Sequence, residues 1–294
     1  MTIKQNIIYI SHGAGPMPLL GDPGHRDMVA TLQGLAKRIG KPSAVLVISA
    51  HWEARVPSIT AGNTPQLIYD YGGFPAEAYQ IQYPCSGEPA LAEQVYQSFA
   101  NAGIDAALDS SRGFDHGMFV PSKIMYPDAD IPCVQISLTQ SLNAAEHLAM
   151  GRALRALQWD NLLVIGSGAS FHNIPAFFSA EQNELDQKNA AFEQWLTETL
   201  ASGDISETDR RERLVQWEAA PFARFCHPRE EHLLPLHVCY GMAGDVCEET
   251  IPTTIMGKQA LMFHCIVSGE KVFTGLEKQR KSDRQQCKKN RQAH

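Results

Sequence analysis

The chain has 294 residues, of which 44% are hydrophobic, 8% aromatic and 19% charged, and this composition excludes a fibrous or wholly disordered protein. Its formal net charge of −7 argues against a nucleic-acid-binding core. No apolar stretch reaches the roughly 18–20 residues that a membrane span requires, and the first residues show no signal peptide, so we expect a cytoplasmic protein without a membrane partner.

Charge is unevenly distributed along the chain. Residues 268–294 contain eight Lys or Arg against three acids, a net charge of +5, which leaves −12 for residues 1–267. The last segment has almost no apolar side chains to bury, and this predicts a disordered basic tail. No Pro/Gly/Ser-rich linker or internal repeat interrupts residues 1–267, so we expect them to form a single domain.

Short apolar runs alternate with helical patterns along the chain. Continuous β-branched runs predict strands that are buried on both faces, at 6–11, 44–50, 132–137 and 162–166, with later strands at 251–256 and 259–267. Apolar residues at helical spacing predict helices at 25–39, 88–101, 143–157 and 181–201. The alternation predicts an α/β fold with a central mostly parallel or mixed sheet flanked by helices.

The seven cysteines do not predict a disulfide framework. Their number is odd and no CxxC pair occurs. Cys133 and Cys265 lie inside apolar runs, where cysteine usually packs as a small hydrophobic residue.

Three of the apolar runs are each followed by a histidine. His12 and His51 come directly after the first two strands, and His172 follows the 162–166 strand and a Gly/Ser-rich turn. Ligands of open α/β sheets gather outside the carboxyl ends of the strands, so these side chains predict a site there.

Two further stretches carry histidines in loop-like or mixed sequence. The segment RGFDHGMFVP places His116 beside Asp115 between two glycines, as in an active-site loop. The segment HPREEHLLPLH begins at His227, and its Pro228 predicts a helix start with His232 on the second turn. We expect His237, His147 and His264 to be structural, and leave His25 open.

Several neutral imidazoles that converge on one place favour a divalent metal such as Zn or Fe. The chain contains no GxSxG nucleophile motif, and its glycine-containing loops match neither phosphate-binding pattern. The HExxH zinc motif is also absent. The sequence therefore predicts a metal cleft at the carboxyl ends of the strands.

Seven stretches, in order, resemble the class III extradiol ring-cleavage dioxygenases, in the branch typified by DOPA 4,5-dioxygenase. They are SHGAGPMPLL, VISAHWEA, YDYGGFPAEAY, YPCSGEPALA, RGFDHGMFVPSKIMYPDADIPCVQISL, IGSGASFHN and HPREEHLLPLH. The resemblance covers residues 9 to about 240 and implies that residues 1–267 form the catalytic domain. It implies an enzyme that uses non-haem Fe(II) and O2 to open the ring of a catechol-type aromatic diol.

The resemblance also implies roles for single residues. His12, His51 and His232 correspond to the metal ligands, His172 to the active-site base beside the metal, and His116 to a second acid/base group. An all-histidine site could also hold Zn in the purified protein, and His172 could itself be a ligand. The usual facial triad contains one carboxylate, so Glu231, Glu230 and Glu53 remain alternatives for a ligand.

The residues leave other functions open. A zinc hydrolase could use the same histidines with Glu231 or Glu53 as base, and a Memo-like metal-binding protein without dioxygenase activity resembles the same fold. Arg112, Lys123 and Arg229 could bind a substrate carboxylate, although we expect them at the surface. Four aromatic residues could line the site, although we expect core packing for each: Trp52, Tyr71, Phe74 and Phe114. The substrate and the oligomeric state are not defined.

Overall fold

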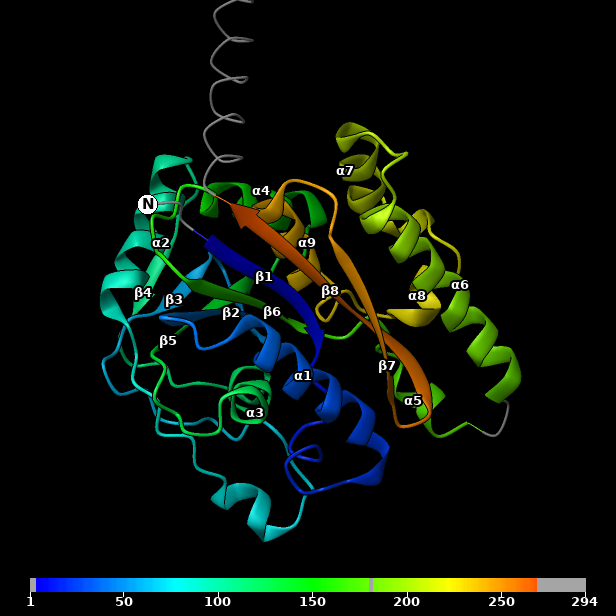
Figure 1. The fold of residues 1–294 in the computed structure, drawn as a ribbon, viewed down its shortest axis with the longest axis horizontal. Coiled ribbons are helices and arrows are strands. Elements are labelled where there is room, and N and C mark those ends of the chain that lie inside the picture. The colour runs from blue at the N-terminus through cyan, green and yellow to red at the C-terminus, as the bar shows by residue number, and fades with distance from the viewer. Residues whose placement is uncertain (1–3, 180–181, 269–294) are drawn as a thin grey trace, which may run out of the picture.

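A single mixed sheet of eight strands forms the centre of the molecule in a computed structural model that describes residues 4–179 and 182–268 (Figure 1). The strand order is β4-β3-β5-β2-β6-β1-β8-β7, and β1, β6, β2 and β5 are parallel neighbours. The strands are β1 (Lys4–Ser11), β2 (Ala44–Ala54), β3 (Ser58–Thr60), β4 (Ala107–Asp109), β5 (Cys133–Thr139), β6 (Leu162–Gly168), β7 (Glu249–Ile255) and β8 (Lys258–Ser268).

The predicted α/β fold with a central mostly parallel or mixed sheet flanked by helices is confirmed, and the sheet is mixed. The two late strands extend the parallel centre in the antiparallel sense, β8 against β1 and β7 against β8. The sequence did not predict β3 and β4, because a strand of three residues shows no readable alternation. Apart from Ser268, the predicted basic tail lies outside the described residues.

Helices cover both faces of the sheet. The α-helices are α1 (Arg26–Ile39), α2 (Pro89–Asn101), α3 (His116–Met125), α4 (Ala144–Leu154), α5 (Ile174–Phe177), α6 (Gln182–Ala201), α7 (Glu207–Val215), α8 (Ala223–Cys226) and α9 (Leu234–Ala243). Short 3-10 helices are Pro23–His25, Ala76–Gln80 and Trp217–Ala219. Figure 1 shows α1 and α3 on one side of the sheet and α4 and α9 on the other.

The alternation of side chains along each central strand divides the core in two. On β1, Ile7 and Tyr9 pack with α4 and α9, whereas Ile8 and Ile10 pack with α1 and α3. All four side chains are buried, as the continuous apolar run predicted. With helices on both faces, only the ends of the strands remain open for a site.

The helix predicted from Pro228 is wrong. The helix α8 ends at Cys226, and the next helix, α9, begins only at Leu234 with Pro235 in its first turn. The carbonyl oxygen of His232 accepts hydrogen bonds from the backbone N–H of Ala169 (3.0 Å) and the hydroxyl of Tyr9 (2.9 Å). A helix that ran through this residue would use the same carbonyl for its own ladder, so the tertiary contacts favour a turn.

The cysteine prediction holds for Cys133, which is buried and free, and fails for Cys265. Cys265 on β8 forms a disulfide with Cys247, which precedes β7. The antiparallel pairing of these two strands brings the Cα atoms to 4.5 Å, a contact that the spacing of cysteines along the chain does not reveal.

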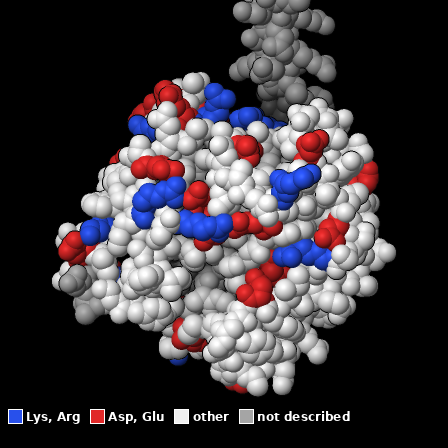
Figure 2. Space-filling model, turned by 180° about the vertical axis from the view of Figure 1, so that it is seen from behind, with Lys and Arg blue, Asp and Glu red and all other residues white. Residues whose placement is uncertain are grey.

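The surface carries charges of both signs. On the face shown in Figure 2, Lys and Arg lie beside Asp and Glu. Pairs of this kind include Arg224 with Glu218 and Glu230, and Arg38 with Glu249. Within residues 4–179 and 182–268, no helix is long and apolar enough to cross a membrane.

Glu193 on α6 is buried, and burial raises the pKa of its carboxyl to about 7 from an ordinary 4.5. Because the folded-state pKa is raised, the contribution of the neutral Glu193 carboxyl to the free energy of unfolding is complete below about pH 4.5. This contribution is lost as the pH rises to 7. We expect the free energy of unfolding of the wild type to fall by about 3 kcal/mol between these pH values relative to Glu193→Gln. Urea unfolding of both proteins across this range measures the difference.

The exposed Glu198→Gln on the same helix is the control, and its unfolding curve should follow the wild type at every pH. If Glu193→Gln and the wild type lose stability in parallel, Glu193 is ionised in the fold and the expectation is wrong.

Candidate metal centre

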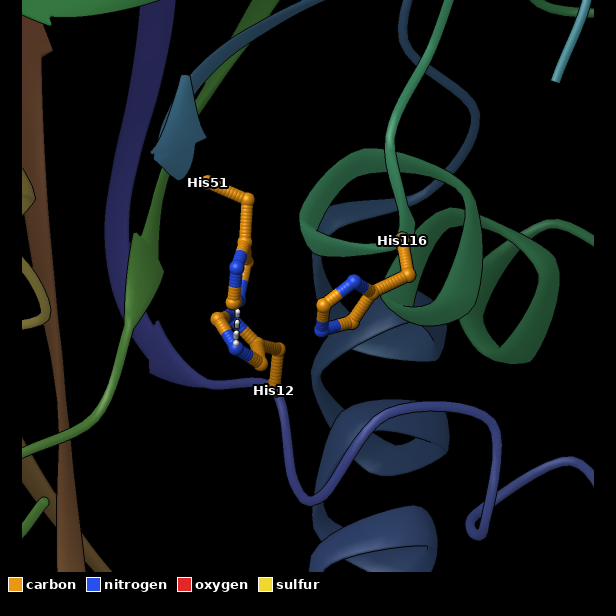
Figure 3. A group of neighbouring side chains, drawn as sticks. All are labelled: His12, His51 and His116. Carbon is orange, nitrogen blue, oxygen red and sulfur yellow. Dashed lines mark hydrogen bonds between the residues drawn. The ribbon is translucent and has the colours of Figure 1, made fainter. Parts of the chain in front are cut away.

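His12 and His51 meet at the carboxyl edge of the sheet although their strands are not neighbours. His12 follows the last residue of β1, His51 lies on β2, and β6 runs between these strands. Their Nε2 atoms are 3.0 Å apart, and Figure 3 shows the two rings directed toward each other. Imidazoles are long enough to bridge the gap that one intervening strand leaves.

A break in the register of β2 positions His51. Ser49 pairs with Ser137 of β5, but the next paired residue is Glu53, opposite Leu138. The residues between Ser49 and Glu53 therefore bulge out of the ladder. Bulges of this kind re-aim side chains beside active sites, and this one directs His51 toward His12.

His232 and His172 form the other side of the cluster. Their rings stack with centroids 3.4 Å apart, and the His232 ring lies 5.2 Å from that of His12 and 4.9 Å from that of His51. Both rings direct Nδ1 at the same carboxylate oxygen, Oε1 of Glu231, at 2.9 Å from His232 and 3.3 Å from His172. One buried carboxylate thus orients two imidazoles.

His116 completes the group from the first residue of α3 (Figure 3). Its ring centroid is 3.8 Å from that of His51. Oδ1 of Asp70 accepts hydrogen bonds from both the backbone N–H (2.9 Å) and Nδ1 (2.8 Å) of His116. The neighbouring Asp115 is occupied elsewhere, since it accepts a hydrogen bond from Ser49 at 2.7 Å.

The three imidazoles proposed as ligands are neutral. Burial and the neighbouring histidines hold the pKa values of His12 and His51 well below the ordinary value, and burial lowers the pKa of His232 to about 4. For Glu231, burial raises the pKa, but hydrogen bonds from His172 and His232 outweigh it and hold the pKa well below its usual range. A neutral imidazole beside a fixed carboxylate is the form that binds a cation.

Hydrogen bonds also determine which ring nitrogen of His12 and of His232 has a lone pair available for a metal. Ser167 Oγ donates its proton to the carbonyl of Gly117, so it accepts from His12 Nδ1–H at 2.9 Å. The lone pair of His12 therefore lies on Nε2, the atom that faces His51 Nε2. By the same argument, the Glu231 carboxylate takes Nδ1–H of His232 and leaves its Nε2 free.

This donor set fits a divalent metal. Two ligand nitrogens at about 2.1 Å from an ion and at right angles to each other lie about 3.0 Å apart. The Nε2 atoms of His12 and His51 have this separation. Among the described residues, two groups of side chains bring their ligand atoms close enough to hold an ion: His12, His51 and His116, and His172, Glu231 and His232.

A cavity of about 390 Å³ opens onto the five histidines. It lies between the loop after β1, the Tyr71–Phe74 segment, the α5 region and the turn between β7 and β8. Gly13, with a φ of +85°, lets the loop after β1 turn sharply, and a Cβ here would lie 2.8 Å from the ring of His25. A cavity of this size holds a small organic molecule.

The histidine left open by the sequence supports this loop. His25 is buried, its Nδ1 lies 2.7 Å from Asp22, and its Nε2 accepts the backbone N–H of Ala14 at 3.1 Å. The histidines expected to be structural lie outside the cavity lining, and each ring has a hydrogen-bond partner. His147 bonds to the backbone carbonyl of Asn143, His237 to that of Leu214, and His264 to the side chain of Asn6.

The predicted aromatic candidates divide into two pairs. Tyr71 and Phe74 line the cavity, contrary to the core packing that we expected for them. Phe114 is fully buried in the core on the α1 and α3 face, and Trp52 is covered by the guanidinium of Arg112 at 4.3 Å from its ring centroid.

Asp70 and Ser167 were not predicted as site residues, although both orient ring nitrogens of the cluster. Asp70 lies in the glycine-containing stretch YDYGG, and an acidic residue in such a loop is the one feature of the sequence that could have indicated a site residue. Ser167 lies at the carboxyl end of β6, the edge at which the histidines were expected.

Asp70→Ala is expected to lower kcat by about 10- to 100-fold, the usual loss when a positioning partner of a site histidine is removed. His116 would lose the acceptor that holds its Nδ1–H. Asp70→Asn keeps an acceptor oxygen in the same place and should retain activity within a few-fold. Steady-state kinetics with metal analysis measures both variants, and equal losses in the two would contradict a positioning role.

Clustered histidines that surround an apolar-walled cavity at the open edge of an α/β sheet define a metal-dependent enzyme for a small substrate. The profile of the catalytic LigB subunit of aromatic ring-opening dioxygenases matches residues 7–264. The chain belongs to this family and is an extradiol aromatic ring-opening dioxygenase, as the sequence motifs predicted.

Individual relatives agree with this membership. "Dioxygenase tasH" of Hapsidospora irregularis is 39% identical over 81% of this chain and 78% of its own length. "4,5-DOPA dioxygenase extradiol" of Beta vulgaris is 37% identical over 81% of this chain and 86% of its own. The crystal structure of an uncharacterised Escherichia coli K12 protein is 28% identical, with a TM-score of 0.68 over 90% of this chain and 99% of that one.

Proposed function

We propose that the enzyme is a non-haem Fe(II)-dependent dioxygenase that opens the ring of a catechol beside its diol, with His12, His51 and His232 as metal ligands. One observation carries the proposal: beside these neutral imidazoles lie two further histidines, each with Nδ1 directed at a carboxylate, His172 at the Glu231 that also holds His232 and His116 at Asp70. A metal-binding protein without catalysis would have no need for this second pair.

The chain's own residues supply proton transfer and orientation. With Nδ1 directed at Glu231, the other nitrogen of His172 accepts a proton from a catechol hydroxyl, and the carboxylate stabilises the charge that results. His116, held by Asp70, donates a proton as the ring opens. Bound Fe(II) supplies the coordination of the diol and O2 and the electron transfer between them. One catechol and one O2 give one ring-opened product that contains both oxygen atoms.

The hydrolase alternative lacks a free base. Glu53 is bound by both terminal nitrogens of Arg229 at 2.6 and 2.7 Å, and Glu231 orients His232 and His172. Of the carboxylates left open as ligands, Glu230 pairs with Arg224. We therefore assign no carboxylate ligand.

We further propose that residues 1–267 are the catalytic domain. The cytoplasmic location stays a prediction.

Anaerobic reconstitution with Fe(II), followed by O2 and a panel of catechols, tests the proposal. We expect a yellow ring-opened product and matching O2 uptake with Fe(II) but not with Zn. Tight Fe(II) binding without O2 uptake on any catechol would contradict the proposed function and favour the Memo-like alternative.

A further inference from the structure

Away from its histidines, the cavity has apolar walls. Phe74, Phe171, Ile174, Phe177, Phe178 and Met256 all line it. The hydroxyl of Tyr71, another lining residue, already donates to the carbonyl of Ala78 at 2.7 Å. The space that would receive a ring substituent therefore offers aromatic and aliphatic surface.

The charged groups near the cavity are paired. Of the described residues that line it, Lys258 is the only Lys or Arg, and it is buried against Asp186 with Nζ 2.5 Å from Oδ1. The same described lining contains no Asp or Glu. Neither end of an amino-acid zwitterion finds an opposite charge on these walls, and an unpaired charge is costly to bury.

The basic residues that the sequence suggested for a substrate carboxylate do not line the cavity. Arg112 binds Asp115 at 3.1 Å, Lys123 donates to the carbonyl of Gln82 at 2.9 Å, and Arg229 binds Glu53. Each cation is therefore occupied away from the substrate space.

The cavity rim is apolar and exposed. Phe178 is 74% exposed and Ile174 is 50% exposed, and both lie at or beside α5. Large exposed hydrophobic side chains at the edge of a binding cavity lose their contact with water when an apolar group covers them. The rim thus continues the apolar character of the walls out to the surface.

We propose, on the basis of the proposed function, that the preferred substrate is a catechol with an uncharged, apolar substituent rather than an amino-acid catechol. The diol faces the histidines, and the substituent lies against Phe74 and the α5 side chains. This separates the enzyme in specificity from relatives whose names carry DOPA, despite the shared family.

Calorimetric binding under anaerobic conditions to the Fe(II)-loaded protein tests this without turnover. The probes share one ring and differ in charge: 4-propylcatechol is neutral, dihydrocaffeate is anionic and L-DOPA is zwitterionic. We expect 4-propylcatechol to bind on the order of 100-fold more tightly than L-DOPA, because only the charged probes must be desolvated without a partner. The values of kcat/KM under O2 should rank the probes in the same order.

Phe178→Ala is expected to lower the preference for 4-propylcatechol over unsubstituted catechol by about fivefold, through lost apolar contact. Phe222→Ala is the matched control, since Phe222 is 49% exposed but lies outside the cavity lining, and it should leave the preference unchanged. Phe178→Arg should reduce the discrimination against dihydrocaffeate by adding a cation at the rim.

The outcomes separate the two proposals. Binding of L-DOPA as tight as that of 4-propylcatechol would overturn the substrate inference, whether or not the ring opens. Tight binding of 4-propylcatechol without O2 uptake would overturn the proposed function and support the inference. If no catechol binds the Fe(II)-loaded protein, both are wrong.

Discussion

Replacing His232 with alanine is expected to strip the protein of Fe(II), whereas His116→Ala is expected to keep the metal and lose turnover. His232 presents a free Nε2 lone pair because Glu231 holds its Nδ1–H. Loss of a direct ligand should weaken metal binding by more than the 10- to 100-fold that loss of an outer partner costs. Loss of the acid/base group should lower kcat by about 10²- to 10⁴-fold. Metal-to-protein ratios after reconstitution and desalting, together with kcat, measure both effects.

These two variants decide between two ligand sets. His116 lies as close to His12 and His51 as a ligand would, so geometry alone permits either His116 or His232 as the third ligand (Figure 3). His264→Ala is the control, because this buried ring contacts Asn6 outside the cavity lining and its loss should affect neither metal nor rate. Retention of Fe(II) by His232→Ala together with its loss from His116→Ala would reverse the assignment.

His172→Ala is expected to lower kcat by about 10²- to 10⁴-fold while the protein keeps its Fe(II). The ring stacks on His232 and directs Nδ1 at Glu231, so its other nitrogen is free to accept a substrate proton. Without it, the catechol would have to lose its proton to water. Single-turnover kinetics with metal analysis of the same samples separates the proton-transfer step from metal binding.

Loss of Fe(II) from His172→Ala would contradict this role. If the variant loses Fe(II) as His232→Ala does, His172 is a ligand and the stacked pair binds the metal together. If it keeps full activity, the base lies elsewhere. Glu231→Gln serves as a further test, since it weakens the acceptor of both rings and should lower kcat by about 10- to 100-fold.

The positions of the central strands were readable because burial on both faces leaves a plain local signal. The runs that form β1, β2, β5 and β6 are continuous in apolar residues, and His12 and His51 stand where these runs end. The family motifs then marked His116, His172 and His232, and the structure brings all five rings to one cavity.

Local sequence patterns gave a wrong prediction where two positions were equally suited to begin a helix. Pro228 and Pro235 both suit the first turn of a helix. The hydrogen bonds from Tyr9 and Ala169 to the His232 carbonyl favour the later start, with Pro235 in the first turn. The bulge that aims His51 has no local mark either, because it depends on the register with β5.

The sequence by itself determined the fold class, the strand ends that carry histidines and the five histidines that line the cavity, since apolar runs and motifs are local patterns. Tertiary structure alone decided how those histidines are oriented. Asp70 reaches His116 from 46 residues away, and Ser167 orients His12 across 155 residues. The side chains that fix each ring nitrogen and shape the apolar cavity come together only when the sheet and its loops have closed, because hydrogen bonds join neighbours in space.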